Sequence, residues 1–370
     1  MPDLAGFRAL VAGAAAGAGR DARTLWSRLG AAGVLRDVYH ASPDGALEPD
    51  PARLGALLTE LDASNPLGVV LSVCVPVATV IPLLAEVSGH SPLAGKVAER
   101  ALGGESIVAL AVTDSCVPGS ELIDTRTEVD IGDTEITLRG GKDWITNATH
   151  CDHILVLCRH RDARHFSSLS WVLAPADAEG VSACPATGLF AGSGVGHLRF
   201  DGLRLDRDHL VGRPGRALAS FARRVGTERL AGALWAQGLC RRVLADTRRW
   251  LAGRTAGGRT QWENPAIRQR FGRCLVDLHH LDALCALHSS DPTGVTSAGE
   301  GMVLKAAVGL SVAQILRECA DLRGADAFRD GGEAGLCMEA AMFGIAGGAT
   351  GTMLAGVADH ADTLLGGFGS

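Results

Sequence analysis

The stretch Gly140-Gly-Lys-Asp-Trp-Ile-Thr-Asn-Ala-Thr-His-Cys-Asp-His-Ile-Leu-Val-Leu157 gathers several residue types that functional sites use. It holds two glycines, a lysine, a tryptophan and two threonines, and it ends in an apolar run that favours a strand. Aromatic residues make up only 4% of the 370 residues, so a tryptophan in this short span is notable. This segment is the first candidate for a functional site.

The totals of the chain exclude several classes of function. Its 41 acidic residues outnumber 35 Lys and Arg, giving a net charge of −6 and a pI near 6.1, which argues against a nucleic-acid partner. The ten cysteines form no Cys-x-x-Cys pair, and the first residues lack the pattern of a secretion signal. We therefore expect a cytoplasmic protein. Apolar runs such as 68–84 contain Pro76 and Pro82, so no membrane helix is expected.

Residues 1–106 have the apolar spacing of helices. Apolar residues recur at helical spacing over 25–35 and over 54–61, and prolines separate the two groups. The run from 69 to 84 is almost wholly apolar, which predicts a helix buried on every side. We expect this central helix to start near Pro66 and the whole of 1–106 to form a helical domain.

At residue 107 the pattern changes to that of strands. Residues 127–139 alternate with period two around Gly132-Asp133, which predicts a hairpin with one solvated face. Short apolar or alternating runs at 106–112, 154–158, 169–173 and 195–205 continue the pattern. We therefore predict a β domain over 107–214.

Helical spacing returns after residue 215 and persists to the end. The pattern predicts a bundle of four helices over 221–243, 267–284, 302–322 and 338–365, the last interrupted by Gly347-Gly348. The expected fold class is α+β, with a helical domain (1–106), a β domain (107–214) and a C-terminal helical bundle (215–370).

Motifs in this order resemble those of the acyl-CoA dehydrogenase family across nearly the whole chain. The matching segments are Thr113-Asp114 with Gly119-Ser120-Glu121, Gly140-x-Lys142-x-Trp144-Ile145-Thr146-Asn147, Thr227-Glu228-Arg229, and Arg254 with Gly258. The resemblance implies a helical N-terminal domain, a β-barrel or β-sandwich middle domain, a C-terminal four-helix bundle and FAD as the cofactor.

The resemblance also implies which residues hold FAD. They are Thr113, Gly119, Ser120, Trp144, Thr146, Arg254 and Thr350. Ser120 matches the position whose hydroxyl meets the pyrophosphate, and Arg254 matches an arginine that reaches the FAD of a neighbouring subunit, which implies a homodimer or a tetramer. Each residue also has a simpler interpretation: Trp144 as a core aromatic, Gly140-Gly141 as a turn, and Arg254 as a solvated charge.

The catalytic base departs from the usual pattern of the family. Most members carry a Glu in an Ile-Tyr-Glu-Gly-Thr motif, and here the matching stretch, Ile345-Ala-Gly-Gly-Ala-Thr350, has Gly347 at the position of the base. One branch, which includes the isovaleryl-CoA dehydrogenases, carries the Glu at the position of Glu228 instead. Glu228 is therefore the candidate base, and a helix-start carboxylate is the alternative. The Gly347 N–H keeps the donor that meets the thioester oxygen in the family.

Other departures affect the cofactor and carrier sites. The Gly-Gly-x-Gly-Tyr segment of the family is replaced by Arg323-Gly-Ala-Asp-Ala-Phe328, the arginine-rich segment after it by Gly331–Gly335, and the Phe of Arg-x-x-Phe-Gly by Gly257. The histidines at 150, 153, 160 and 165 are expected to be packing or solvated residues and not metal ligands.

The resemblance implies a flavin-dependent dehydrogenase of an acyl thioester. A base removes the proton α to the carbonyl, and the β hydrogen passes as hydride to flavin N5. The acyl group is carried by CoA or by an acyl carrier protein, and an electron-accepting flavoprotein or oxygen reoxidises the flavin. Two alternatives are a two-component flavin monooxygenase of the same fold and a catalytically silent scaffold.

Overall fold

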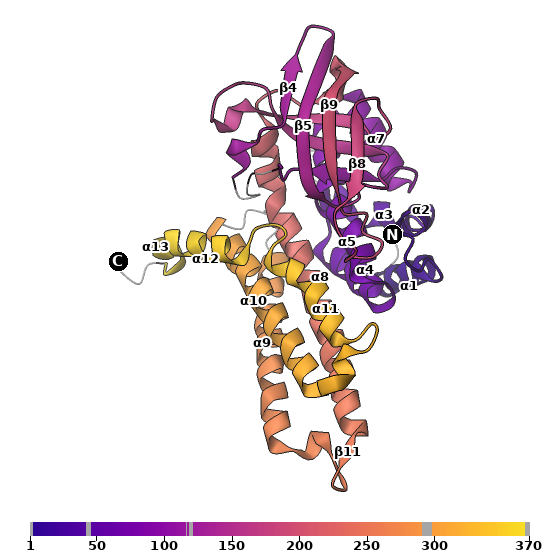
Figure 1. The fold of residues 1–370 in the computed structure, drawn as a ribbon, viewed down its shortest axis with the longest axis vertical. Coiled ribbons are helices and arrows are strands. Elements are labelled where there is room, and N and C mark those ends of the chain that lie inside the picture. Colours follow the sequence, from indigo (N-terminus) through magenta and orange to yellow (C-terminus); the bar gives the residue numbers. More distant parts are fainter. Residues whose placement is uncertain (1–2, 42–45, 116, 118–120, 291–297, 367–370) are drawn as a thin grey trace. The chain divides into compact units, whose positions relative to one another are not determined.

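The computed structural model describes residues 3–41, 46–115, 117, 121–290 and 298–366. The chain divides into two units, Met1–Glu228 and Arg229–Ser370, and the boundary lies inside one continuous helix, α8 (Ala217–Gly253). Figure 1 shows helices and a sheet in the first unit and mostly helices in the second. This succession of helices, strands and helices is the predicted α+β order.

Helices open the first unit. The side chains of Asp3, Asp21 and Asp50 accept hydrogen bonds from first-turn N–H groups, which no helical carbonyl can reach. The helices are α1 (Leu4–Ala15), α2 (Ala22–Ala31), α3 (Val34–Asp37), α4 (Pro51–Ser64), α5 (Leu67–Val75), α6 (Ile81–Val87) and α7 (Pro92–Leu102). The helical spacing over 25–35 and 54–61 is thereby confirmed.

The apolar run after Pro66 forms one continuous helical segment. A π-turn, η1 (Pro76–Val80), joins α5 to α6, so the helical path runs past both prolines, and the predicted buried helix over 69–84 is confirmed. By length and composition alone, the 21 residues Leu67–Val87 could cross a membrane. However, 89% of the 18-residue stretch that meets this criterion is buried within the protein. The segment is a core helix of the first unit.

A short hairpin lies among these helices. Strand β1 (Tyr39–Ala41) pairs antiparallel with β2 (Leu47–Pro49). The helical region 1–106 thus includes a short hairpin that the sequence did not predict. Pro49 and Pro51 lack the N–H that a helix interior requires, so this stretch pairs as strands before Pro51 starts α4.

Eight strands form the sheet of the first unit. They are β3 (Val108–Ala111), β4 (Glu128–Ile131), β5 (Glu135–Ile145), β6 (His153–Arg159), β7 (Leu169–Pro175), β8 (Val181–Pro185), β9 (Gly196–Asp206) and β10 (Leu210–Val211). Their order is β10-β7-β6-β4-β5-β9-β8, and β3 pairs with β6. The predicted hairpin is confirmed as β4 and β5, in which Ile131 faces Ile136. The sequence did not predict β8, because its residues are mostly exposed and show no alternation.

The second unit is built on the rest of α8 and on α9 (Pro265–Ser289) and α10 (Ala298–Arg323), which confirm three of the predicted helices. The segment Ala298–Phe328 is also long and apolar enough to cross a membrane by length and composition alone. Of its 18-residue stretch that meets this criterion, 56% is buried within the protein. The small elements are β11 (Thr255–Ala256), β12 (Arg259–Thr260) and the 3-10 helices η5 (Gln261–Glu263) and η6 (Gly324–Phe328).

The fourth predicted helix, over 338–365, is not one helix. The chain forms α11 (Glu333–Ala340), the 3-10 turn η7 (Ala341–Gly344), α12 (Thr350–Asp359) and α13 (Ala361–Leu364). Gly347 and Gly348 have φ values of 71° and 121°. Positive φ is incompatible with a right-handed helix, so the glycine pair ends the helical path more completely than the sequence suggested.

Candidate functional site

Trp144 lies on strand β5 at an irregularity in its pairing with β9. Figure 1 shows these two strands side by side. Its φ is 59°, which is rare for a bulky side chain and costs about 1–3 kcal/mol. The indole is 60% exposed and meets the His197 ring edge-on at 5.5 Å between centroids. The interpretation of Trp144 as a core aromatic was therefore wrong within the first unit. At this irregular part of β5, the strained backbone of Trp144 leaves its flat apolar indole open to solvent.

Polar side chains hold the bulge from beneath. Asp143 pairs with Arg199 at 2.8 Å and with His197 Nδ1 at 3.0 Å. Partial burial opposes the charge of Asp143, but hydrogen bonds and the Arg199 guanidinium outweigh it and lower its pKa. Asp143 therefore stays ionised and ties β5 to β9 next to Trp144.

Gly140 and Gly141 lie inside β5 and do not form the turn that the sequence allowed as an alternative. Gly140 has a φ of 127°, and a Cβ there would lie 2.7 Å from Thr127 Cα. A Cβ on Gly141 would lie 2.8 Å from Arg199 Nη1. Gly140 therefore needs glycine, because its φ is positive and the Thr127 backbone lies close, whereas a side chain at 141 would displace the flexible Arg199 side chain.

The structure brings Thr113 alongside this strand. The Thr113 carbonyl accepts a hydrogen bond from the Asp143 N–H at 3.0 Å, and Thr146 lies half-buried in the turn that follows β5. Thr113, Trp144 and Thr146 thus come from one small region of the first unit. Gly119 and Ser120 lie outside the described residues.

Lys142 carries a buried charge beneath the same region. Its side chain is 0% exposed, and its Nζ donates to Asp114, to the Val112 carbonyl at 3.0 Å and to Thr125 Oγ1 at 2.9 Å. Burial opposes ionisation of Asp114, but the Lys142 charge and several hydrogen bonds outweigh it and lower the Asp114 pKa. The pair fixes the Thr113 segment against β5.

Asn147 links this turn to the central helix. The residue is 1% exposed with a φ of 66°, and its Nδ2 donates to the Ser72 carbonyl at 2.9 Å. In a regular helix residue 76 would supply that bond, but Pro76 has no N–H. The Asn147 amide therefore satisfies a carbonyl that proline leaves without its helical donor.

Glu228 is half-buried on α8 at the end of the first unit. The Thr79 hydroxyl, on η1, donates to Glu228 Oε2 at 3.2 Å. Cys74 on α5 is close enough to respond to the same carboxylate: burial, and then the Glu228 charge, raise the pKa of its thiol to about 12. Glu228 thus faces the central helix of its unit, a partly desolvated place that suits a carboxylate base.

Gly347 and Thr350 lie in the second unit. The Gly347 carbonyl accepts from Arg229 Nε at 3.4 Å, and Thr350 Oγ1 donates to the Gly344 carbonyl at 3.1 Å. Arg229 directly follows Glu228 in α8. Within the second unit, Arg229 therefore joins the Gly347 backbone to α8.

Arg254 directly follows the last residue of α8. Its guanidinium pairs with Asp326 at 2.8 Å and lies 5.0 Å from the Trp250 ring centroid. The side chain remains 52% exposed. These contacts hold the charge near η6 and leave half of its surface open.

Two domains of one known protein family match this chain. Residues 109–203 match the acyl-CoA dehydrogenase middle domain, and residues 218–361 match the acyl-CoA dehydrogenase C-terminal domain, together well over half of the chain. The chain belongs to the acyl-CoA dehydrogenase family. The predicted family and fold class are confirmed, and the family is FAD-dependent.

Individual relatives within this family are distant. The acyl-(acyl-carrier-protein) dehydrogenase MbtN of Mycolicibacterium paratuberculosis is 25% identical over 315 residues, covering 82% of this chain and 76% of that protein. The prolyl acyl carrier protein oxidase AnaB superposes with a TM-score of 0.86 at 17% identity over 99% of both chains. The FAD complex of PigA gives 0.81 at 17% identity over 92% of this chain and 89% of that one.

Three residues with a structural role at this site were not among the predicted site residues. Thr79 is a polar residue in an otherwise apolar buried run, Asn147 is an asparagine at a strand end, and Lys142 is a charge on an otherwise alternating strand. A buried polar group must find a partner, so the position of Thr79 between Pro76 and Pro82 was a usable signal. Partners 149 residues apart, such as Thr79 and Glu228, give no local sequence pattern.

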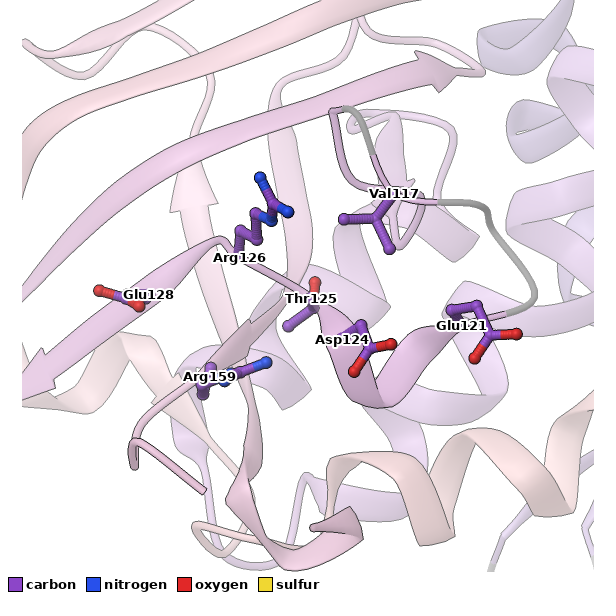
Figure 2. Close-up of a pocket in the computed structure, with 7 residues that line it drawn as sticks. All are labelled: Val117, Glu121, Asp124, Thr125, Arg126, Glu128 and Arg159. Atoms are coloured by element: carbon purple, nitrogen blue, oxygen red, sulfur yellow. The ribbon is translucent and has the colours of Figure 1, made fainter. Parts of the chain in front are cut away.

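A pocket of about 380 Å³ lies on the first unit (Figure 2). Its lining residues are Val117, Glu121, Asp124, Thr125, Arg126, Glu128 and Arg159. None of the described candidate site residues lines it. Five of its seven lining residues are charged, and Asp124 also pairs with Arg164, so it lacks the apolar surface that a flavin ring requires.

The four histidines considered above form local hydrogen bonds. His150 bonds to Asn147, His153 to Ser106, His160 to Ser170 and His165 to Ser167. Among the described residues, no group of three or more His, Cys, Asp or Glu is arranged to hold a metal ion.

Proposed function

We propose that this chain is a FAD-dependent dehydrogenase of an acyl thioester carried by an acyl carrier protein, with CoA as the alternative carrier. The observation that carries the proposal is Glu228, a half-buried carboxylate hydrogen-bonded to Thr79 at the position where one branch of the family has its base. The names of MbtN and AnaB, which act on carrier-protein thioesters, favour that carrier.

The residues of the first unit fit FAD. The 60% exposed indole of Trp144 offers an apolar face, and Thr113 and Thr146 supply polar groups close by in the chain and the sheet. Gly119, Ser120, Arg254 and Thr350 complete the proposed set. When bound, the flavin supplies a hydride acceptor for the β hydrogen of the acyl group.

The proton is handled by the chain itself. Glu228 would take the proton α to the thioester carbonyl, and the α C–H electron pair would form the Cα=Cβ double bond as the β hydrogen leaves with its own electron pair. The Gly347 N–H would donate to the thioester oxygen and stabilise the negative charge that develops on it. Glu228 is suited to this task by its half-buried place beside Thr79 and Cys74, which limits the water around the carboxylate.

Anaerobic mixing with acyl thioesters tests the proposal. We expect yellow protein whose flavin absorbance bleaches on addition of an acyl carrier protein thioester, without NAD(P)H, and bleaches more slowly with the matching acyl-CoA. Bleaching by acyl-CoA alone would favour CoA as the carrier. Colourless protein that binds only reduced flavin would indicate a monooxygenase, and protein that binds no flavin would indicate a scaffold.

Glu228→Gln tests the base. The variant should retain flavin and lose at least about 10³-fold in the rate of bleaching, because an amide cannot accept the proton. Glu105→Gln, an exposed glutamate paired with Arg100, is the matched control and should bleach at the wild-type rate. Unchanged bleaching in Glu228→Gln would contradict the assignment of the base.

A further inference from the structure

The π-turn η1 is held by side chains from two other elements. Its geometry sends the Ile81 N–H to the Pro76 carbonyl, and Pro82 has no N–H, so the Val77 carbonyl lacks a helical donor. The Tyr39 hydroxyl donates to that carbonyl at 2.6 Å. Together with the Asn147 bond to Ser72, this satisfies one carbonyl within the turn and one on α5 just before it. The turn is therefore a built feature of the core, of the kind often found at functional sites.

Helix α8 is fixed in register against this turn. The Arg224 guanidinium is 7% exposed and pairs with Glu86 at 3.1 Å and with Glu48 at 2.6 Å. Four residues later, on the same face of α8, Glu228 meets Thr79. Because α8 advances from 224 to 228 while its contacts run from 86 to 79, the two segments are antiparallel at two fixed points. The ion pairs of Arg224 thus keep Glu228 opposite Thr79.

Thr79 bonds across elements and not along its own helix. A threonine within a helix commonly bonds a carbonyl one turn earlier, but the Thr79 hydroxyl donates to a carboxylate 149 residues away. Its side chain is 0% exposed, so water does not compete at the hydroxyl, and a β-branched side chain has few rotamers in a helix. The donor is therefore aimed by the fold.

We propose that Thr79 is a positioning residue for Glu228, whose hydroxyl holds the carboxylate in the orientation from which it takes the substrate proton. This inference rests on the proposed function. A carboxylate has lone pairs for several hydrogen bonds, so the bond to Oε2 does not prevent proton acceptance. The bond instead removes rotamers of Glu228 that do not face the substrate. Its loss should therefore slow proton transfer and leave the affinity for the thioester unchanged.

The test compares Thr79→Val with Thr79→Ser in the flavin-loaded protein. Valine keeps the shape and removes the donor, whereas serine keeps the donor. We expect Thr79→Val to slow flavin bleaching at saturating thioester about tenfold or more, with the thioester concentration for half-maximal rate and the flavin content unchanged. Thr79→Ser should return the rate to within about threefold of wild type. Thr247→Val, another fully buried helical threonine, is the matched control and should bleach at the wild-type rate.

An infrared measurement reads the contact without turnover. The bands absent from Glu228→Gln identify the carboxylate of Glu228, and these bands should shift in Thr79→Val and return in Thr79→Ser. Wild-type rates together with unshifted bands in Thr79→Val would overturn the role of Thr79 while the proposed function stands. Failure of every acyl thioester to bleach the wild-type flavin would overturn the proposed function, and the base with it.

Discussion

Lys142 is fully buried, although lysine is among the residue types that are almost never buried without a partner. Its partners are Asp114, the Val112 carbonyl and Thr125, and they account for its ammonium group without any ligand. Lys142 therefore has a structural role in this motif: it holds the segment around Asp114 against β5. Trp144, two residues later, exposes its side chain to solvent.

Asp114→Asn should lower the free energy of unfolding by about 3–5 kcal/mol at neutral pH, because it leaves the Lys142 charge buried without its counter-charge. The lowered pKa of Asp114 means that its contribution is present above the unfolded carboxyl pKa, about 3.9, and is lost as pH falls through the folded value. The difference between wild type and variant should therefore shrink below about pH 4. Urea unfolding at several pH values measures it.

The control for this substitution is Asp130→Asn. Asp130 is 77% exposed and pairs with Arg139, so its loss should change stability by less than about 1 kcal/mol. Equal stability of Asp114→Asn and Asp130→Asn at neutral pH would contradict the account of the buried pair.

At the scale of elements, periodicity predicted the long helices and the β4–β5 hairpin because a single face of each is buried. It did not predict η1 or the broken path after Ala340, since both depend on backbone groups that proline or glycine removes or redirects. Glu228 could be proposed from its motif, but its contact with Thr79 depends on the packing of α8, which no local pattern records.

Pro76→Ala should disturb η1 selectively. An alanine at this position supplies the N–H that a regular helix donates to Ser72, in competition with Asn147, and so favours the α register over the π-turn. We expect the melting temperature to stay within a few degrees while flavin bleaching slows about tenfold, because Thr79 rotates away from Glu228. Stopped-flow absorbance measures the rate.

Pro92→Ala is the control for this variant. Pro92 occupies the first turn of α7, where its missing N–H has no helical acceptor in any case. The control should bleach at the wild-type rate. A Pro76→Ala variant that bleaches as fast as Pro92→Ala would show that the π-turn does not matter for the base.

At the scale of the whole molecule, the remaining question is what Arg254 binds. Its guanidinium is held by Asp326 and Trp250 yet stays half exposed, and the resemblance places the FAD of a second copy against it. We expect Arg254→Ala to form the same oligomer as wild type but to lose about tenfold in FAD affinity, because a charge-assisted contact to the pyrophosphate disappears. Sedimentation velocity read at 280 and at about 450 nm separates assembly from flavin content.

Arg249→Ala, which removes an exposed arginine paired with Asp246 on α8, is the control and should keep both the oligomer and the flavin affinity of wild type. If flavin stays bound to Arg254→Ala as tightly as to Arg249→Ala, or if wild-type flavin sediments with a monomer, a second copy does not complete the cofactor site.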